Sequence, residues 1–137
     1  MVKISEVIDQ EVPFLYDDHL GHVTVCPSDL GTSLKITCVV DLPVLGKNPD
    51  ALIDAITELK LETIPVPSPD DPKLVLFEVS NQIKLGFTEI EVIEFFIKAL
   101  KGLIKTEIDF KKQELEKQKR MEEEEKARVA AENEANM

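Results

Sequence analysis

The feature of this sequence that most constrains its fold is a helical segment that begins near Thr88 and is longer than a small domain is wide. Thr88 and Glu91 have the spacing of a capping box, and Phe87 with Val92 has that of a hydrophobic staple. An apolar stripe at helical spacing follows, made of Ile93, Phe96, Ile97, Leu100, Leu103, Ile104 and Ile108. A helix from residue 88 to residue 128 is roughly 60 Å long, whereas a small domain is about 30 Å across. Its last part must therefore project away from the rest of the chain.

The charge pattern indicates where the projection begins. The apolar stripe fades after Phe110, and residues 111–128 contain 13 charged residues among 18. Several of these are favourable i,i+4 pairs, namely Glu116 with Arg120, Glu122 with Lys126 and Glu124 with Arg128. The sequence therefore predicts a folded domain over residues 1–110 and a charged helical extension over residues 111–137, with a frayed end from Ala130. The extension is interpreted either as a docking helix, coiled coil or spacer, or simply as a solvated helix.

Upstream of this helix, the sequence predicts a mixture of strands and one shorter helix. Alternating or β-branched residues favour strands over residues 22–26, 34–42 and 74–79, with a turn at residues 27–31. The helix is expected over residues 48–59, capped by Asn48, with Pro49 in its first position and an apolar face of Leu52, Ile53, Ile56 and Leu59. Four prolines predict an extended, non-helical loop over residues 63–73. The pattern predicts an α+β domain.

The composition restricts the possible partners. The chain has 27 acidic and 16 basic residues, a net charge of −11, and its only arginines are Arg120 and Arg128. Nucleic acids and anionic membranes require clustered cations, and polyphosphates are usually held by guanidinium groups, so the sequence disfavours all three as ligands. Charged residues interrupt the most apolar stretch, which excludes membrane insertion. Without a signal peptide, Cys26 and Cys38 are expected to be free thiols in the cytoplasm.

Two stretches of the chain resemble the phosphagen kinases, the family of creatine and arginine kinases. Residues 14–35 read Phe-Leu-Tyr-Asp-Asp-His-Leu-Gly-His-Val-Thr-Val-Cys-Pro-Ser-Asp-Leu-Gly-Thr-Ser-Leu-Lys. They are similar to the reactive-cysteine segment of the family, where a strand ends in Cys-Pro-Ser/Thr-Asn-Leu-Gly-Thr. Residues 77–89 read Phe-Glu-Val-Ser-Asn-Gln-Ile-Lys-Leu-Gly-Phe-Thr-Glu, similar to the family's closing strand and the turn into its last long helix. The resemblance covers residues 12–110 and implies part of an antiparallel sheet flanked by helices, as in the family's catalytic domain, with the long helix projecting from it.

The resemblance also implies which residues correspond to the family's kinase machinery. Family members transfer the γ-phosphoryl of MgATP to a guanidino nitrogen, and arginines around the phosphates do most of the positioning. Cys26 matches the reactive cysteine, and Ser28 matches the hydroxyl that supports it. However, Lys35 replaces a family arginine, Asp29 replaces an asparagine, and residues 63–73 lack the arginines of the family's mobile loop. The other arginines, the acid that orients the guanidinium and the helical N-terminal domain lie upstream in the family and are expected to be absent.

Cys26 and Ser28 are therefore interpreted as vestigial, and no catalytic, cofactor-binding or metal-binding residue is assigned. The simplest interpretation of Cys26 is a small buried residue at a strand end, because the nearby Asp29 carboxylate disfavours a thiolate. His19, His22 and Cys26 have the chemistry of metal ligands, but a third convergent ligand is not evident. A nucleophilic dyad of Cys26 with His22 also lacks an orienting group. The sequence predicts no cofactor and no metal.

The chain is accordingly predicted to be a pseudoenzyme, a non-catalytic structural or interaction protein. It is expected to dock on other proteins of a larger assembly through the edge of its truncated sheet and its C-terminal helix. The long charged helix favours a cytoskeletal or ciliary assembly, such as the axoneme, over a respiratory one. The first alternative is a guanidino kinase whose missing arginines come from another chain. The second is a regulatory binder of a true phosphagen kinase.

Overall fold

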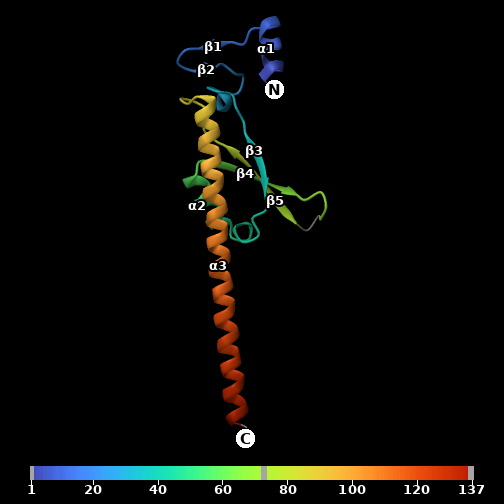
Figure 1. Ribbon diagram of the computed structural model, residues 1–137, viewed down its shortest axis with the longest axis vertical. Coiled ribbons are helices and arrows are strands. Elements are labelled where there is room, and N and C mark those ends of the chain that lie inside the picture. The colour runs from blue at the N-terminus through green and yellow to red at the C-terminus, as the bar shows by residue number, and fades with distance from the viewer. Residues whose placement is uncertain (1, 72–73, 136–137) are drawn as a thin grey trace.

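The structure is a computed structural model that describes residues 2–71 and 74–135. Along the chain its elements are α1 (Val2–Glu11), β1 (Tyr16–Asp17), β2 (Gly21–His22), the 3-10 helix η1 (Pro27–Asp29), β3 (Thr37–Val40), the 3-10 helix η2 (Leu45–Lys47), α2 (Pro49–Glu58), β4 (Leu61–Pro67), β5 (Val75–Asn81) and α3 (Glu89–Ala135). Small antiparallel sheets with flanking helices and a long C-terminal helix confirm the predicted α+β class (Figure 1).

The main sheet has the strand order β3-β5-β4, and both pairings are antiparallel. The two outer strands differ in what they offer to a further strand. β4 carries Pro65 and Pro67, which have no N–H group to donate, whereas β3 contains no proline. One edge of this sheet is therefore blunted, and the edge at β3 remains open.

Two predictions about extended segments are wrong. Residues 63–67 of the predicted loop belong to strand β4, which tolerates Pro65 and Pro67 because both stand on the same, unpaired side of an edge strand. Pro72 and Lys73 of that loop lie outside the described residues. The strand predicted over residues 22–26 ends at His22, because the Thr24 hydroxyl donates a hydrogen bond to the Cys26 carbonyl oxygen at 2.7 Å. Such local bonds compete with strand pairing.

Other predicted elements are confirmed with small changes. The helix predicted over residues 48–59 is α2, but the Asn48 side chain does not cap it and instead donates to the Val44 carbonyl oxygen at 3.0 Å. The predicted strands over residues 34–42 and 74–79 are β3 and β5. β3 begins only at Thr37, because the side chain of Asn81 takes the backbone hydrogen bonds of Leu34 and Ile36.

The core lies where one face of α2 and one face of α3 pack against the sheet. Leu45, Val79 and Leu103 are fully buried at its centre. The buried apolar residues of α3 are Val92, Phe96, Ala99 and Leu103, so the predicted apolar stripe is wrong in part. Four of its members are 42% to 47% exposed, namely Ile93, Ile97, Ile104 and Ile108. This helix has two apolar faces, and a single sheet covers only one of them.

A buried carboxylate of α3 accepts hydrogen bonds from the backbone at the start of η2. Glu107 is only 7% exposed, and each of its two oxygens accepts a backbone hydrogen bond of 2.9 Å, one from Val44 and one from Leu45. These amides belong to the first turn of η2, where N–H groups have no partner within the helix. The sequence pattern did not single out Glu107, because a charged residue within a helix is ordinarily a surface residue.

The start of α3 has the predicted capping box. Glu91 Oε2 accepts a hydrogen bond from the Thr88 N–H group at 2.8 Å, and the Thr88 hydroxyl oxygen accepts one from the Glu91 N–H group at 3.3 Å. The helix contains 47 residues and continues to Ala135, beyond the point where fraying was predicted. Asn136 and Met137 lie outside the described residues. None of the described helices is long and apolar enough to cross a membrane.

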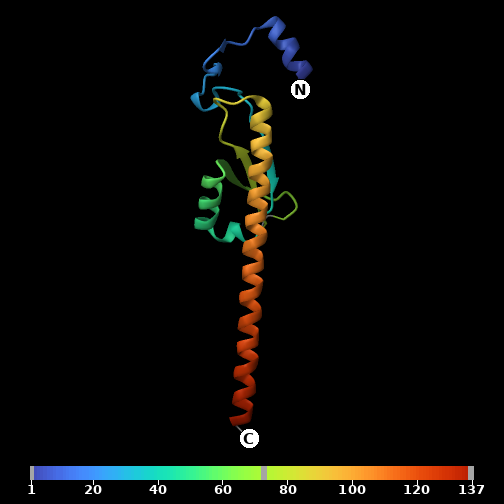
Figure 2. The same cartoon turned by 60° about the vertical axis from the view of Figure 1, so that its left-hand side comes forward.

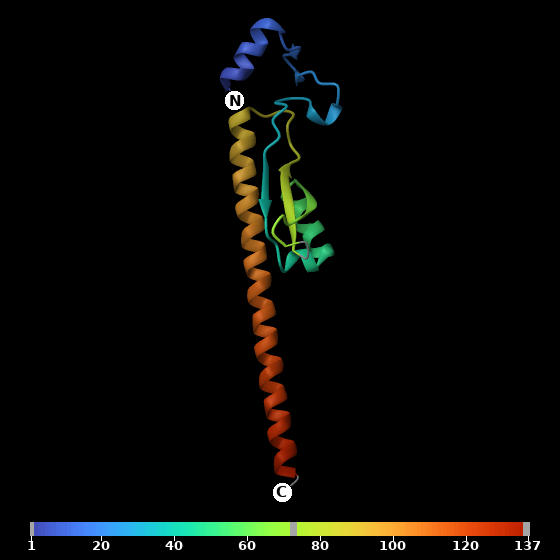
Figure 3. The same ribbon diagram turned by 90° about the vertical axis from the view of Figure 1, so that its right-hand side faces the viewer.

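Both ends of the chain extend from the central body, in opposite directions. The second half of α3 continues straight past the sheet and projects away from the body (Figures 1 and 2). Residues 111–132 are all exposed. At the other end, α1 forms an arm near the first turn of α3 (Figure 3). None of the residues of α1 is buried, and the sequence analysis did not predict this helix.

Candidate functional site

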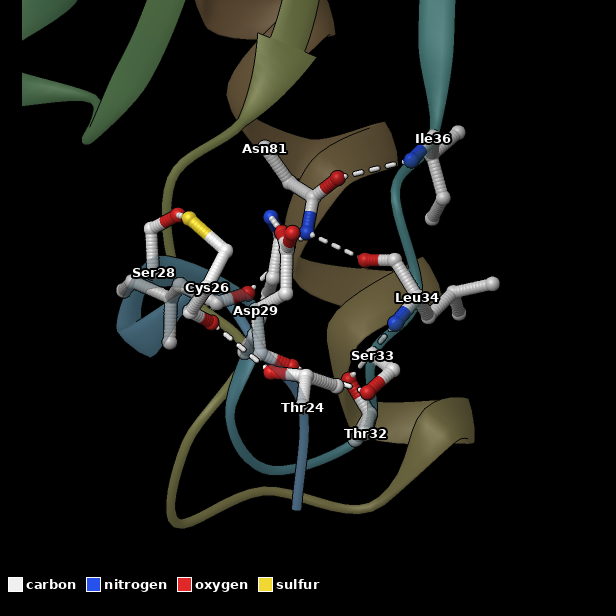
Figure 4. Close-up of polar contacts among 11 residues, drawn as sticks. Thr24, Cys26, Ser28, Asp29, Thr32, Ser33, Leu34, Ile36 and Asn81 are labelled. Carbon is white, nitrogen blue, oxygen red and sulfur yellow. Dashed lines mark hydrogen bonds and ion pairs between the residues drawn. The ribbon is translucent and has the colours of Figure 1, made fainter. Parts of the chain in front are cut away.

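The segment that resembles the reactive-cysteine region lies near the first turn of α3, at the opposite end of the body from the projecting helix. Figure 4 shows how its turn meets the residues that follow β5. The Asp29 N–H group donates to the Cys26 carbonyl oxygen at 3.0 Å and closes η1. The hydroxyl of Ser33 then donates to the Asp29 carbonyl oxygen at 2.8 Å. Together these bonds fold the turn back on itself and give it a fixed shape.

Asn81 fastens this region to the sheet. Its Oδ1 accepts a hydrogen bond from the Ile36 N–H group at 2.7 Å, and its Nδ2 donates to the carbonyl oxygens of Leu34 and Ile83 at 3.0 Å each (Figure 4). The side chain is 3% exposed, so these bonds replace water. Asn81 therefore joins the segment before β3 to the turn after β5, and it sets the geometry of the site.

Glycine is required where the turn crosses the segment after β5. Gly31 has a φ of +104°, and a Cβ at this position would lie 2.3 Å from the Lys84 carbonyl oxygen. That same oxygen accepts a hydrogen bond from the Thr32 N–H group at 3.0 Å. The Leu-Gly-Thr sequence thus allows a close backbone crossing that a side chain would prevent.

Cys26 and Ser28 lie together, as the resemblance implies. The Cys26 Sγ is 3.0 Å from the Ser28 Oγ, and both residues are exposed. The interpretation of Cys26 as a buried residue is wrong, because it stands at the exposed start of η1 rather than at the end of a paired strand. Both Cys26 and Cys38 are free thiols. The vestigial role of Cys26 and Ser28 stays a prediction.

The charge of Asp29 is balanced by a partner that the sequence analysis missed. The Lys84 ammonium forms an ion pair and hydrogen bond with the Asp29 carboxylate, and the Lys84 side chain is only 10% exposed. The two residues are 55 positions apart, so no local pattern signals the pairing. Asp29 therefore does not act on Cys26 as an isolated negative charge, which weakens the electrostatic argument against a Cys26 thiolate.

The other candidate residues do not assemble into a site. Lys35, which stands for a family arginine, is exposed. The His22 ring makes edge-on contacts with Tyr16 and Phe14, at ring-centre distances of 5.2 and 6.3 Å. Across the described ranges, 2–71 and 74–135, no three His, Cys, Asp or Glu side chains gather in a way that could hold a metal ion.

A hollow of about 590 Å³ opens between α1 and the turn at residues 32–34. Its titratable lining is mainly acidic, with Glu6, Asp9 and Glu89 around the single histidine, His22. Nearby, hydrogen bonds from the Thr88 backbone N–H and from its hydroxyl lower the pKa of Glu91 below its ordinary value of 4.5. This end of the molecule is electronegative, which disfavours the binding of phosphate groups.

We compared the sequence with those of known protein families. Residues 1–110 match the family described as ATP:guanido phosphotransferase, C-terminal catalytic domain. The chain belongs to this family. The resemblance inferred from the Cys-Pro-Ser and Ser-Asn segments is confirmed.

Individual relatives agree with this assignment. The protein-arginine kinase of Bacillus cytotoxicus is 34% identical over 108 residues, which cover 77% of this chain and 30% of that protein. The B-type creatine kinase of Gallus gallus is 34% identical over 95 residues, which cover 69% of this chain and 25% of that protein. The crystal structure of a lombricine kinase has a TM-score of 0.64 and 26% identity, over 80% of this chain and 30% of that one. The chain thus spans at most 30% of the length of these relatives.

Proposed function

We propose that this chain is a non-catalytic interaction protein, built on the C-terminal catalytic domain of the phosphagen kinases and acting as a subunit of a larger protein assembly. The observation that carries this proposal is the absence of arginine from residues 1–119. Guanidinium groups that surround the phosphates perform most of the work of phosphoryl transfer. A domain of this family without one has kept the scaffold and lost the groups that act on ATP.

The electrostatics of the site support this proposal. The Lys84 ammonium is already paired with the Asp29 carboxylate. Lys35 is exposed and supplies only a point charge to a phosphate. The hollow beside the turn is lined by carboxylates, which repel a polyphosphate. MgATP would therefore meet negative potential and no bidentate donor on this face of the domain.

The exposed apolar surface indicates what the scaffold does instead. Eleven large apolar side chains within residues 2–25 are exposed, which is far more than scattered surface residues account for. Figure 3 shows this arm standing off the body, beside the start of α3. A protein bound to this arm would bury these side chains. A second place for a partner is the unpaired edge of strand β3, where Val39 is 54% exposed.

The projecting helix favours a place in an extended assembly. Forty-seven residues of α3 give a rod of about 70 Å at ~1.5 Å per residue, far longer than the body of the domain needs. Rods of this kind space or join components. For this reason a cytoskeletal or ciliary assembly is the version of the proposal that we favour.

The interaction is tested by affinity capture of the tagged chain from cells that express it. The variant carries Phe14→Ser, Leu15→Ser and Tyr16→Ser, three exposed positions of the arm. The matched control is Ile53→Ser, an equally exposed apolar position on α2. We expect a stoichiometric partner with the native chain and the control, and its loss with the arm variant. No stoichiometric partner with the native chain contradicts the proposal.

One observation favours a second candidate, a guanidino kinase completed by another chain. Cys26 is exposed and lies 3.0 Å from the Ser28 hydroxyl, the arrangement that the family's reactive cysteine implies. In this case the captured partner would supply the arginines. Phosphoryl transfer by the captured complex from MgATP to arginine or creatine, lost with Cys26→Ala, would establish this function in place of the first.

A further inference from the structure

The charged extension of α3 divides into two halves of opposite sign. The basic half (residues 111–120) has five basic and two acidic residues, a net charge of +3. The acidic half (residues 121–132) has five acidic and two basic residues, a net charge of −3. Every residue of both halves is exposed. The extension is therefore an uncovered helix with a positive segment followed by a negative one.

Such a helix gains little stability from its own chain. Its first residues, Gln113, Glu114 and Lys117, border a hollow beside the start of α2. The rest of the described extension projects past the sheet (Figures 1 and 2). Most of the stability of a protein helix comes from tertiary packing, and each i,i+4 pair contributes only a few tenths of a kcal/mol. A second helix beside it would supply the missing contacts.

We propose that the partner of this extension is the extension of a second copy of the same chain, paired in antiparallel orientation. This deepens the proposed function, in which the helix docks on another protein, by naming that protein. Antiparallel pairing with the crossing point between Arg120 and Met121 places each basic half against the acidic half of the other copy. Parallel pairing in register places like charges together, which costs free energy wherever the helix carries a charged residue.

The side chains around the crossing point fit this arrangement. Lys117 of one copy lies at the level of Glu124 of the other, and Lys119 lies at the level of Glu122, each pair occurring twice by symmetry. Met121, which is 61% exposed in the single chain, lies next to the crossing point, opposite Arg120 of the other copy. Leu115 and Val129, both more than half exposed, add apolar contact on either side. The result is a rod with one domain at each end.

The test uses the full chain and two charge-reversed variants. The first carries Glu122→Lys and Glu124→Lys, which makes the acidic half basic and places like charges at the levels of Lys119 and Lys117. The second carries Lys117→Glu and Lys119→Glu, which makes the basic half acidic. Circular dichroism monitors helix content, because Glu122 and Glu124 also have the i,i+4 spacing of ion pairs with Lys126 and Arg128.

Sedimentation equilibrium gives the outcome. We expect the native chain to be a dimer at micromolar concentration, twice its mass of 15.4 kDa, with a Kd that weakens as salt is added. Each variant alone should dimerise about 10- to 100-fold more weakly, and a mixture of the two should regain dimers, because opposite charges face each other again. Small-angle scattering should show the two domains at opposite ends of the particle.

A native chain that stays monomeric at high micromolar concentration overturns the pairing, as does a dimer that both charge reversals leave unchanged. Domains at the same end of the particle overturn the antiparallel orientation. None of these results bears on MgATP binding or on loss of the captured partner, so failure of the pairing and failure of the proposed function are distinguishable.

Discussion

Replacing the buried Glu107 carboxylate by a neutral amide should destabilise the domain far more than the same replacement at an exposed glutamate of α3. In Glu107→Gln, the amide oxygen keeps one backbone hydrogen bond, but an NH2 group now faces the second backbone N–H group. Val44 and Leu45 are 5% and 0% exposed, so water does not replace the lost acceptor. A charge-assisted hydrogen bond contributes about 1.5–3 kcal/mol, and an unsatisfied buried amide costs about 1–3 kcal/mol.

The expected loss of stability is therefore about 3 kcal/mol. For about 110 folded residues, the entropy of unfolding converts this loss to a fall in Tm of roughly 12 °C. Differential scanning calorimetry measures the change directly. Hydrogen exchange adds a local measurement, because the amides of Val44 and Leu45 should lose protection beyond the global loss seen at Val79.

The matched control is Glu94→Gln, an exposed carboxylate on the same helix, for which we expect a Tm within about 2 °C of the native value. If Glu107→Gln and Glu94→Gln melt together, the carboxylate does not anchor η2. If Glu107→Gln lowers the Tm without faster exchange at Val44 and Leu45, the anchoring acts elsewhere.

Three further predictions concern other parts of the molecule. Asn81→Asp places a carboxylate against the carbonyl oxygens of Leu34 and Ile83, and should lower the free energy of unfolding by about 2–4 kcal/mol, measured by chemical denaturation. The control is Gln82→Glu at an exposed position, and equal stability of the two variants refutes the role given to Asn81. The Glu91 carboxyl should titrate by NMR below 4.5, so its capping contribution is present above 4.5 and is lost as the pH falls through the lowered pKa; Thr88→Val should raise that pKa, and titration of the native carboxyl at or above 4.5 contradicts this. Truncation after Phe110 should leave cooperative unfolding intact and abolish assembly with a partner; a truncated chain that does not fold places the domain boundary elsewhere.

The sequence predicted those parts of the fold that local patterns determine. Thr88 and Glu91 form the expected capping box, Pro49 begins α2, and the alternation in β5 was sufficient to place a strand. The family resemblance was carried by short motifs whose geometry is equally local, such as the tight turn around Gly31.

Features that depend on distant residues were not predictable. Glu107 acts on amides 62 and 63 positions away, and Lys84 pairs with Asp29 across 55 positions, so no periodicity points to either. The choice between the two apolar faces of α3 depends on which one the sheet covers, and the stripe of Ile93 and Ile97 was as apolar as the true one. Strand β4 was missed because Pro65 and Pro67 are compatible with a strand only at an edge, and the edge is a property of the whole sheet.

The most direct test of a non-catalytic role is titration calorimetry of MgATP into the full chain, with arginine and then creatine present. An active creatine kinase titrated under the same conditions is the positive control. We expect no heat of binding from this chain at concentrations that saturate the control, because no guanidinium group within residues 1–119 is available to hold the phosphates. Binding of MgATP with micromolar affinity would contradict the proposed function.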